Sequence, residues 1–168
     1  MDKILIVNTG GTFNKIYNPI KGTLDIDREA NSIKSILSAI KVEKYKLINI
    51  IGKDSLDITK QDRMQLLDTI VQYNYKKIII IHGTDTIDKT AKFLDKYIKN
   101  KQIILTGAMV PFSIDPIEAT SNFSLALGYI QSNKKNGIYI AMHSFVKLYK
   151  DIYKNRKLGV FKLKNGKI

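Results

Sequence analysis

Three short segments of this chain combine hydroxyl groups, glycines and a carboxylate, the groups from which a catalytic site can be made. They are Thr9–Thr12 (TGGT), His82–Thr86 (HGTDT) and Thr106–Met109 (TGAM). Each follows an apolar run, mostly of β-branched residues, that is typical of a buried parallel strand. Because ligands of open α/β sheets bind beyond the carboxyl ends of the strands, we expect the three segments to meet at one crevice.

The glycines let the backbone approach closely and leave amide donors beside the threonine hydroxyls, and a helix beginning after Asp85 would add its positive end. Such a crevice would suit an anionic substrate. A threonine hydroxyl is a weak nucleophile near neutral pH, so Thr12 or Thr84 would need a neighbouring base and donors for an oxyanion. Any one of the segments is also an ordinary turn between a strand and a helix, with a Thr or Asp cap; three together favour catalysis.

Strands and helices alternate along the chain, and this alternation must position the three segments. Beyond the three apolar runs, the spacing of apolar residues predicts strands over 45–50, 137–142 and 158–163, the last at an edge, and helices over 29–40, 60–73, 87–98 and 116–131. Successive βαβ units with right-handed crossovers give a doubly wound α/β fold, with a mostly parallel sheet between two layers of helices, of the Rossmann or flavodoxin-like kind.

Two of these regions lead to more detailed expectations. Helix 60–73 should be capped by Thr59 and should bury one face, carrying Met64, Leu67, Ile70 and Val71. Residues 13–27 are rich in Asn, Pro and Gly and predict a long loop, of a length that is usually functional in a compact domain and could close over a substrate.

Composition narrows the class of protein. The chain contains no cysteine, which excludes disulfides and thiol catalysis and suits a reducing compartment. Its first apolar run is too short for a signal peptide or a membrane span, so we expect a soluble cytoplasmic protein that makes no contact with a membrane. At this length we expect residues 1–168 to form one domain.

Charge and histidines suggest neither a polyanion nor a metal. The net charge is +13, but the cations are spread along the chain and are dense only over 147–167, which we interpret as a solvated surface rather than a nucleic-acid site. His82, at a strand end, is interpreted as a hydrogen-bonded structural residue, and His143 has no partner at metal-ligand spacing. We expect neither a metal nor another cofactor.

In their order along the chain, the motifs resemble those of the bacterial type L-asparaginases, the asparaginase/glutaminase family that uses a threonine nucleophile. The matching residues are TGGT, Asp54-Ser55, HGTDT with the following Asp88–Ala91, and TGAM with Pro111. The likeness runs from about Lys3 to about Ala141 and corresponds to the family's amino-terminal domain. Full-length members carry a second, carboxy-terminal domain, which closes the active site of a neighbouring subunit. This chain would then be either a single-domain relative or a fragment.

The resemblance also implies catalytic roles. Thr12 would attack the side-chain amide of L-asparagine, or of a related small amide, and release ammonia through a β-acyl enzyme. Thr84, Asp85 and a lysine would form a triad that assists proton transfer, and a loop tyrosine, here Tyr17, would activate the nucleophile. Lys154 is the nearest match for the lysine, with Lys150 and Lys157 as alternatives.

For substrate binding, the resemblance implies that Asp85 holds the α-ammonium group and Ser55 the α-carboxylate. The full set of implied binding residues is Gly11, Asp54, Ser55, Gly83, Thr84, Asp85 and Ala108. Without the second domain, we expect a homo-oligomer, most simply a twofold dimer, to cover the site. The alternative function is an amino-acid-binding module of the same fold that has lost turnover.

Overall fold

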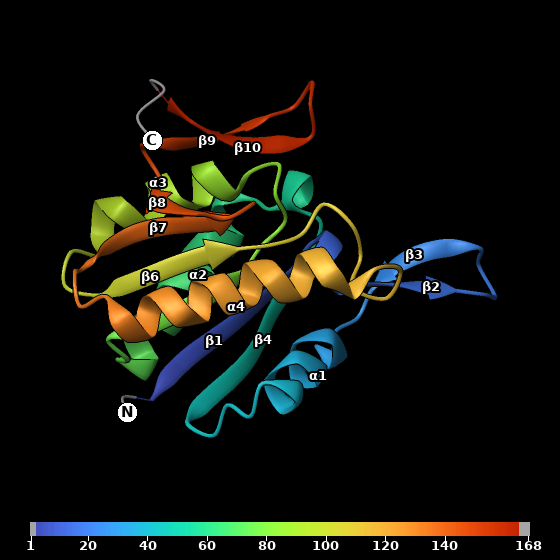
Figure 1. Ribbon diagram of the computed structural model, residues 1–168, viewed down its shortest axis with the longest axis horizontal. Helices are drawn as coiled ribbons and strands as arrows, with labels where there is room; N and C mark the ends of the chain where they lie inside the picture. Colours follow the sequence, from blue (N-terminus) through green and yellow to red (C-terminus); the bar gives the residue numbers. More distant parts are fainter. Residues whose placement is uncertain (1–2, 165–168) are drawn as a thin grey trace.

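Parallel strands of isoleucine, leucine and valine form the centre of the molecule, because both of their faces are buried. The computed structural model describes residues 3–164, and in this part a six-stranded sheet has the order β4-β1-β5-β6-β7-β8 (Figure 1). The first five are parallel, and β8 pairs antiparallel with β7. Their bounds are Ile4–Gly10 (β1), Tyr45–Lys53 (β4), Lys77–Ile81 (β5), Gln102–Thr106 (β6), Gly137–Met142 (β7) and Phe145–Leu148 (β8).

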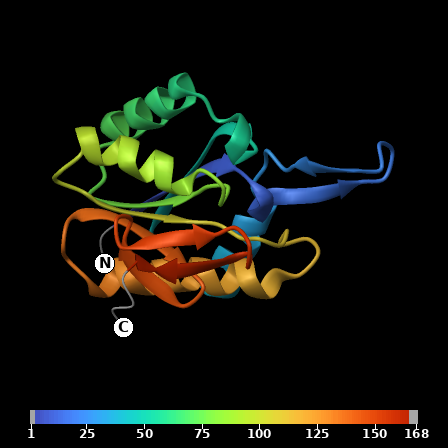
Figure 2. The ribbon, with the colours of Figure 1, turned by 90° about the horizontal axis from the view of Figure 1, so that it is seen from above.

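Successive residues of these strands enter two separate cores. On β5, Ile79 and Ile81 face one core, whereas Ile78 and Ile80 face the other. The first core is covered by α1 (Asn31–Ala39) and α4 (Pro116–Ser132), and the second by α2 (Lys60–Tyr73) and α3 (Ile87–Tyr97). Figure 2 shows the two pairs of helices on opposite sides of the sheet. The doubly wound α/β fold predicted from the sequence is therefore confirmed.

Helix α2 has the predicted bounds and cap, but a different buried face. The Thr59 hydroxyl accepts a hydrogen bond from the Asp62 amide, and the Asp62 carboxylate accepts one from the Thr59 amide, which makes a capping box. The Asp62 carboxylate also pairs with Lys53 of β4 at 2.9 Å, and this contact turns its side of the helix toward the sheet. Leu66 therefore joins Leu67 and Ile70 in the core, whereas Met64 and Val71, which were expected there, are exposed.

Two other expectations are corrected by pairing between segments. Residues 13–27 are not an irregular loop: after a 3₁₀ turn they form the antiparallel hairpin of β2 (Lys15–Asn18) and β3 (Thr23–Ile26), which projects from the molecule (Figure 2). The last strand, β10 (Val160–Leu163), is not an edge of the central sheet. It pairs with β9 (Ile152–Asn155) in a separate hairpin, because Phe161 and Ile152 are buried against the α2–α3 core, and β8 occupies the sheet edge instead.

Within residues 3–164, none of the helices combines the length and apolar character that crossing a membrane would require.

Candidate active site

The predicted motifs meet at the carboxyl end of the sheet. TGGT begins within the end of β1, HGTDT follows β5, TGAM begins at the last residue of β6, and Asp54-Ser55 comes directly after β4. These four strands are neighbours in the order β4-β1-β5-β6. From β1 the chain passes to β4 on one side and then across to β5 on the other, so the topological switch point lies between β1 and β5. Ligands of doubly wound sheets bind at this position.

Glycines allow three of the segments to touch backbone to backbone. Gly11 has a φ of +78°, and a Cβ atom on it would lie 2.5 Å from the nitrogen and Cα of Gly83. A Cβ atom on Gly83 would in turn lie 2.7 Å from the Cβ of Ser55. Side chains at either glycine would force the segments apart, so the two glycines set the spacing of the crevice.

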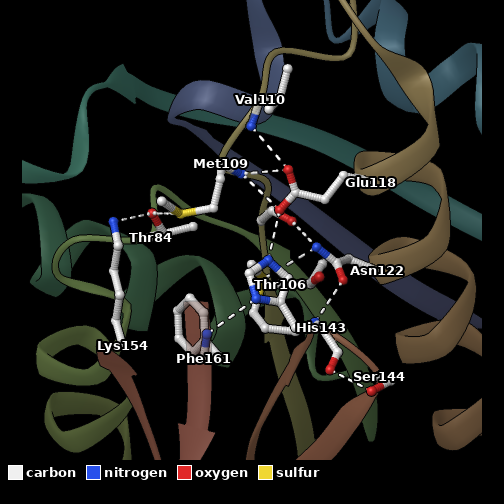
Figure 3. A network of polar contacts seen from close by, with 12 residues as sticks. Thr84, Thr106, Met109, Val110, Glu118, Asn122, His143, Ser144, Lys154 and Phe161 are labelled. Carbon is white, nitrogen blue, oxygen red and sulfur yellow. Dashed lines mark hydrogen bonds and ion pairs between the residues drawn. The ribbon is translucent and has the colours of Figure 1, made fainter. Parts of the chain in front are cut away.

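A lysine from the β9–β10 hairpin completes a triad with the HGTDT motif. The Lys154 ammonium group donates to the Thr84 hydroxyl at 2.8 Å and to Oδ1 of Asp85 at 2.9 Å. The Thr84 hydroxyl donates its own hydrogen toward the sulfur of Met109 at 3.2 Å (Figure 3). Only 11% of the Lys154 side chain is exposed. The lysine of β9 thus contacts both the threonine and the aspartate of the loop after β5.

The two other lysines considered for this position lie elsewhere. Lys150 is 3.8 Å from Asp95 of α3, and Lys157 is exposed. Arg156 was not expected at the site, yet its guanidinium group donates to the backbone carbonyl of Asp85 at 2.6 Å and approaches Oδ1 of that residue at 3.9 Å. Asp85 therefore has two cations beside it.

Asp54 and Ser55 join the site from the end of β4. Asp54 pairs with Lys15 at 2.8 Å. Burial raises the pKa of the Asp54 carboxyl, but the hydrogen bond and charge of Lys15 and nearby backbone amides outweigh it, so this pKa lies below its ordinary value. Ser55 is buried, and its hydroxyl oxygen accepts the Asp85 amide at 3.2 Å. Ser55 and Asp85 are thereby linked directly.

Three other residues expected at the site, Thr12, Ala108 and Tyr17, differ in their burial and surroundings. Thr12 begins the 3₁₀ turn Thr12–Asn14 and is half-buried, and none of the residues 3–164 forms a hydrogen bond to its hydroxyl. Ala108 is buried in the loop after β6. Tyr17 lies on β2 opposite Leu24, is 63% exposed and forms no hydrogen bond to Thr12.

Two depressions border these residues. A cavity of about 260 Å³ lies beside the triad and is lined by Thr84, Lys154 and Arg156 together with apolar side chains of α3, β7 and the β9–β10 hairpin. A wider one, of about 580 Å³, lies between Asp54 and the β2–β3 hairpin. In the described part of the chain, no group of three or more His, Cys, Asp or Glu side chains is arranged to hold a metal ion.

His82 is a structural residue of the HGTDT segment, as its position suggested. It is fully buried, and its ring nitrogens lie 2.8 Å from the Gly83 carbonyl and 2.8 Å from the Thr90 hydroxyl. Arg63 donates to the Thr90 oxygen, so Thr90 gives its hydrogen to Nε2 of His82, and Nδ1 carries the ring hydrogen. Burial lowers the pKa of His82 to about 4. A neutral imidazole therefore fixes the backbone from which Thr84 and Asp85 project.

This burial predicts a pH dependence of stability. The pKa of His82 falls from 6.5 to about 4 on folding, so between these values the unfolded chain binds a proton that the folded chain does not. Above pH 6.5 His82 is neutral in both the folded and the unfolded chain, so the free energy of unfolding has its full value. It should fall by about 3 kcal/mol as the pH drops toward 4. Urea unfolding at pH 7.5, 6 and 5 measures this. An NMR titration in which the His82 ring is protonated at pH 6 would contradict it.

Sequence reasoning missed a polar network next to the triad. Glu118 of α4, Asn122 of the same helix and His143 after β7 are hydrogen-bonded to the TGAM loop and to β10 (Figure 3). These residues come from separate elements, and no short spacing in the sequence identifies them as partners.

Comparison with known proteins identifies related sequences. Residues 3–162 match the protein family described as asparaginase, N-terminal. The chain is 28% identical to the probable L-asparaginase 4 of Schizosaccharomyces pombe over 73% of its length, and 27% identical to the L-asparaginase of Thermococcus kodakarensis over 94%. It covers 35% and 49% of these relatives, so it spans half of their length or less.

Solved structures give the same result. The thermostable L-asparaginase from Thermococcus kodakarensis superposes with a TM-score of 0.83 at 27% identity, over 98% of this chain and 52% of that one. A probable cytoplasmic L-asparaginase from Campylobacter jejuni superposes with a TM-score of 0.82 at 23% identity, over 99% and 54%, and at this identity shows the likeness of fold alone.

Proposed function

Because the chain belongs to the asparaginase family through its N-terminal domain, we propose that it is the catalytic domain of an asparaginase-like amidohydrolase. Its substrate is L-asparagine or a related small amide, and its nucleophile is Thr12. The observation that carries this proposal is the contact of Lys154 with Thr84 and Asp85, directly beside Ser55 and the glycine contact at Gly11.

The reaction proceeds in two steps. The Thr12 hydroxyl oxygen attacks the amide carbon and loses its proton, the C–N bond breaks, and the nitrogen leaves as ammonia after taking up a proton. Water then attacks the carbonyl carbon of the resulting ester, the bond from that carbon to the Thr12 oxygen breaks, the product leaves as a carboxylate, and the threonine oxygen regains a proton. Asp85 holds the Lys154 ammonium group, which donates to the Thr84 hydroxyl, and Thr84 serves proton transfer beside the reacting carbon. Tyr17 activates Thr12 when the β2–β3 hairpin moves toward the crevice, since its present position is exposed.

The hydrogen bonds of Ser55 and Asp85 suit the proposed recognition of an α-amino acid. The Ser55 oxygen accepts the Asp85 amide, which leaves the hydroxyl hydrogen for a substrate carboxylate. Lys154 and Arg156 approach Oδ1 of Asp85, and among residues 3–164 none engages Oδ2, which is left for the substrate ammonium. Asp85 is 35% exposed, so a substrate can reach it.

An ammonia-release assay tests this function. We expect L-asparagine to be hydrolysed faster than L-glutamine or a panel of small amides, and the rate to be the same with and without a chelator. Binding of L-aspartate without release of ammonia would identify the chain as an amino-acid-binding module instead. A chain that neither binds L-aspartate nor releases ammonia would contradict both the enzyme and the binding-module functions.

Replacement of Asp85 by Asn should weaken binding of the amino-acid product. It removes the negative charge that pairs with the α-ammonium group but keeps the shape of the side chain. The loss of one charge-assisted hydrogen bond corresponds to roughly tenfold to a hundredfold in affinity. Calorimetric titration with L-aspartate measures the change, and Asp68→Asn, at an exposed position of α2, is the matched control. Equal affinities of the parent and Asp85→Asn would place the ligand elsewhere.

We also propose that the chain acts as a homo-oligomer, most simply a twofold dimer, in the cytoplasm. The exposure of Asp85 and the half-burial of Thr12 leave the crevice open to a covering element from a second copy. The lack of cysteine is in keeping with a reducing compartment. Light scattering at micromolar concentration decides the oligomeric state, and a monomer that turns over asparagine would contradict the need for a partner.

A further inference from the structure

Glu118 and His143 form a side-chain pair, and each of them binds a residue that neighbours the triad (Figure 3). Glu118 lies in the first turn of α4, and His143 lies in the turn between β7 and β8. Their side chains meet at 3.0 Å, between Nε2 of the imidazole and Oε1 of the carboxylate, and each is largely buried. The proposed reaction so far assigns neither of them a role.

On one side, Glu118 fixes the TGAM loop. Its carboxylate accepts the backbone amide of Met109 at 3.0 and 3.1 Å and that of Val110 at 3.0 Å. Charge-assisted bonds of this kind are among the stronger ones in a protein. The sulfur of Met109 is the acceptor for the Thr84 hydroxyl, so the position of Glu118 is transmitted to one member of the triad.

On the other side, His143 holds the hairpin that carries Lys154. Nδ1 of His143 accepts the backbone amide of Phe161 at 3.1 Å, and Phe161 is the residue paired directly opposite Lys154 in the β9–β10 ladder. The Phe161 ring also meets the imidazole edge to face, with 5.8 Å between the ring centres. Because Nδ1 accepts, Nε2 carries the hydrogen and donates it to Glu118. One imidazole thus bridges α4 and β10.

The backbone that presents this imidazole is strained. His143 and Ser144 both have left-handed conformations, with φ of 48° and 68°, although neither is glycine. Such conformations are unfavourable for residues other than glycine and persist only when the surroundings impose them. Here Asn122 imposes the turn: its side-chain oxygen accepts the His143 amide at 3.0 Å, while its nitrogen donates to the Gly107 carbonyl at 3.0 Å.

We propose that Glu118 and His143 are a positioning pair that holds the Lys154 ammonium group against Thr84. This inference rests on the proposed amidohydrolase function, and it assigns the pair no contact with substrate. Disrupting the pair should therefore lower kcat with little effect on KM, because Ser55 and Asp85 are carried by loops that the pair does not touch. The pair should also protect the Lys154 amine from chemical reagents, and this protection can be measured whether or not the chain is an active enzyme.

The test compares three variants of the chain. His143→Ala removes both ring contacts, whereas His143→Gln retains an acceptor and a donor on one planar group and should restore the bridge in part. Ser144→Ala is the matched control, since it alters the same strained turn at an exposed side chain whose hydroxyl bonds only to the neighbouring carbonyl.

Lysine acylation with a small reagent, followed residue by residue by mass spectrometry, is the first readout. In His143→Ala, we expect Lys154 to be acylated about tenfold faster than in the parent, because its local opening costs less free energy. The exposed Lys60 should react at an unchanged rate and serves as the internal reference. In His143→Gln the rate should return toward that of the parent, and in Ser144→Ala it should stay within about twofold.

Steady-state kinetics is the second readout. With L-asparagine, His143→Ala should lower kcat by roughly 10- to 100-fold while KM stays within about threefold, as expected when a catalytic group is displaced but binding is kept. If the parent hydrolyses no amide, the proposed function fails and the acylation pattern alone still tests the pair. Unchanged protection of Lys154 in His143→Ala, or an equal loss of protection in Ser144→Ala, would overturn the inference. The inference would also be overturned if, in an active enzyme, His143→Ala raised the acylation rate of Lys154 but left kcat unchanged.

Discussion

Replacing Thr12 by alanine is expected to lower kcat for L-asparagine by at least about a thousandfold, because no covalent intermediate can then form. Thr12 stands directly after the glycine contact of Gly11 with Gly83, at the switch point of the sheet, and its hydroxyl has no hydrogen-bonding partner within residues 3–164. It is therefore free to react. Thr12→Ser keeps a hydroxyl and should retain a measurable rate.

Ammonia release by the purified variants measures this effect. Calorimetric titration with L-aspartate shows whether Thr12→Ala still has an intact binding site, which separates loss of chemistry from loss of folding. Thr69→Ala is the matched control, since this threonine lies on the outer side of α2 and bonds only to the carbonyl of its own helix. A Thr12→Ala variant that hydrolyses asparagine as fast as the parent would remove Thr12 from the mechanism.

The second large effect is expected for Lys154→Met, which keeps an unbranched side chain but removes the charge. The Thr84 oxygen and the Asp85 carboxylate both lose their shared donor, and proton transfer through Thr84 should slow by roughly 10²- to 10⁴-fold. Lys154→Arg should not restore the rate, because a planar guanidinium group cannot replace a compact ammonium group between two oxygens 2.8 and 2.9 Å away.

Two further lysines provide matched controls for this prediction. Lys150→Met and Lys157→Met change residues of the same region that the sequence left as alternatives, and both lie outside the triad. Each should alter kcat by no more than about twofold, in line with other surface substitutions. If either variant loses the activity that Lys154→Met keeps, the contact seen in the structure is not the one that serves the reaction.

Signals that are local in the sequence predicted the scaffold and most of the crevice. The isoleucine-rich runs are followed within three residues by Gly10, His82 and Gly107, so the strand ends and the motifs attached to them could be placed. The bounds of α2 follow from Thr59, whose capping partner lies three residues away. Interactions of this range depend on few neighbours, which is why the sequence alone is sufficient for them.

Contacts between distant segments were not predictable in the same way. Lys154 meets Thr84 across 70 residues, and only the resemblance to the family singled it out, with Lys150 and Lys157 as alternatives. No spacing in the sequence identified the hydrogen-bonding partner of His143, because Glu118 comes from another element, 25 residues away. The β2–β3 hairpin and the separate pairing of β10 likewise depend on register, which polar, exposed strands specify weakly.

The triad is divided between the central sheet and the β9–β10 hairpin. Two free energies of opening therefore matter: that of unfolding the sheet and that of detaching the hairpin. Thr84 and Asp85 are held by a strand buried on both faces, and they should resist opening until the whole domain unfolds. Lys154 is held by a two-stranded sheet, which is marginal by itself and depends on Phe161, Ile152 and the bridge at His143. Under rising temperature or denaturant, catalytic competence should therefore disappear before the fold does, and residual activity will measure the docking of one hairpin rather than the integrity of the domain.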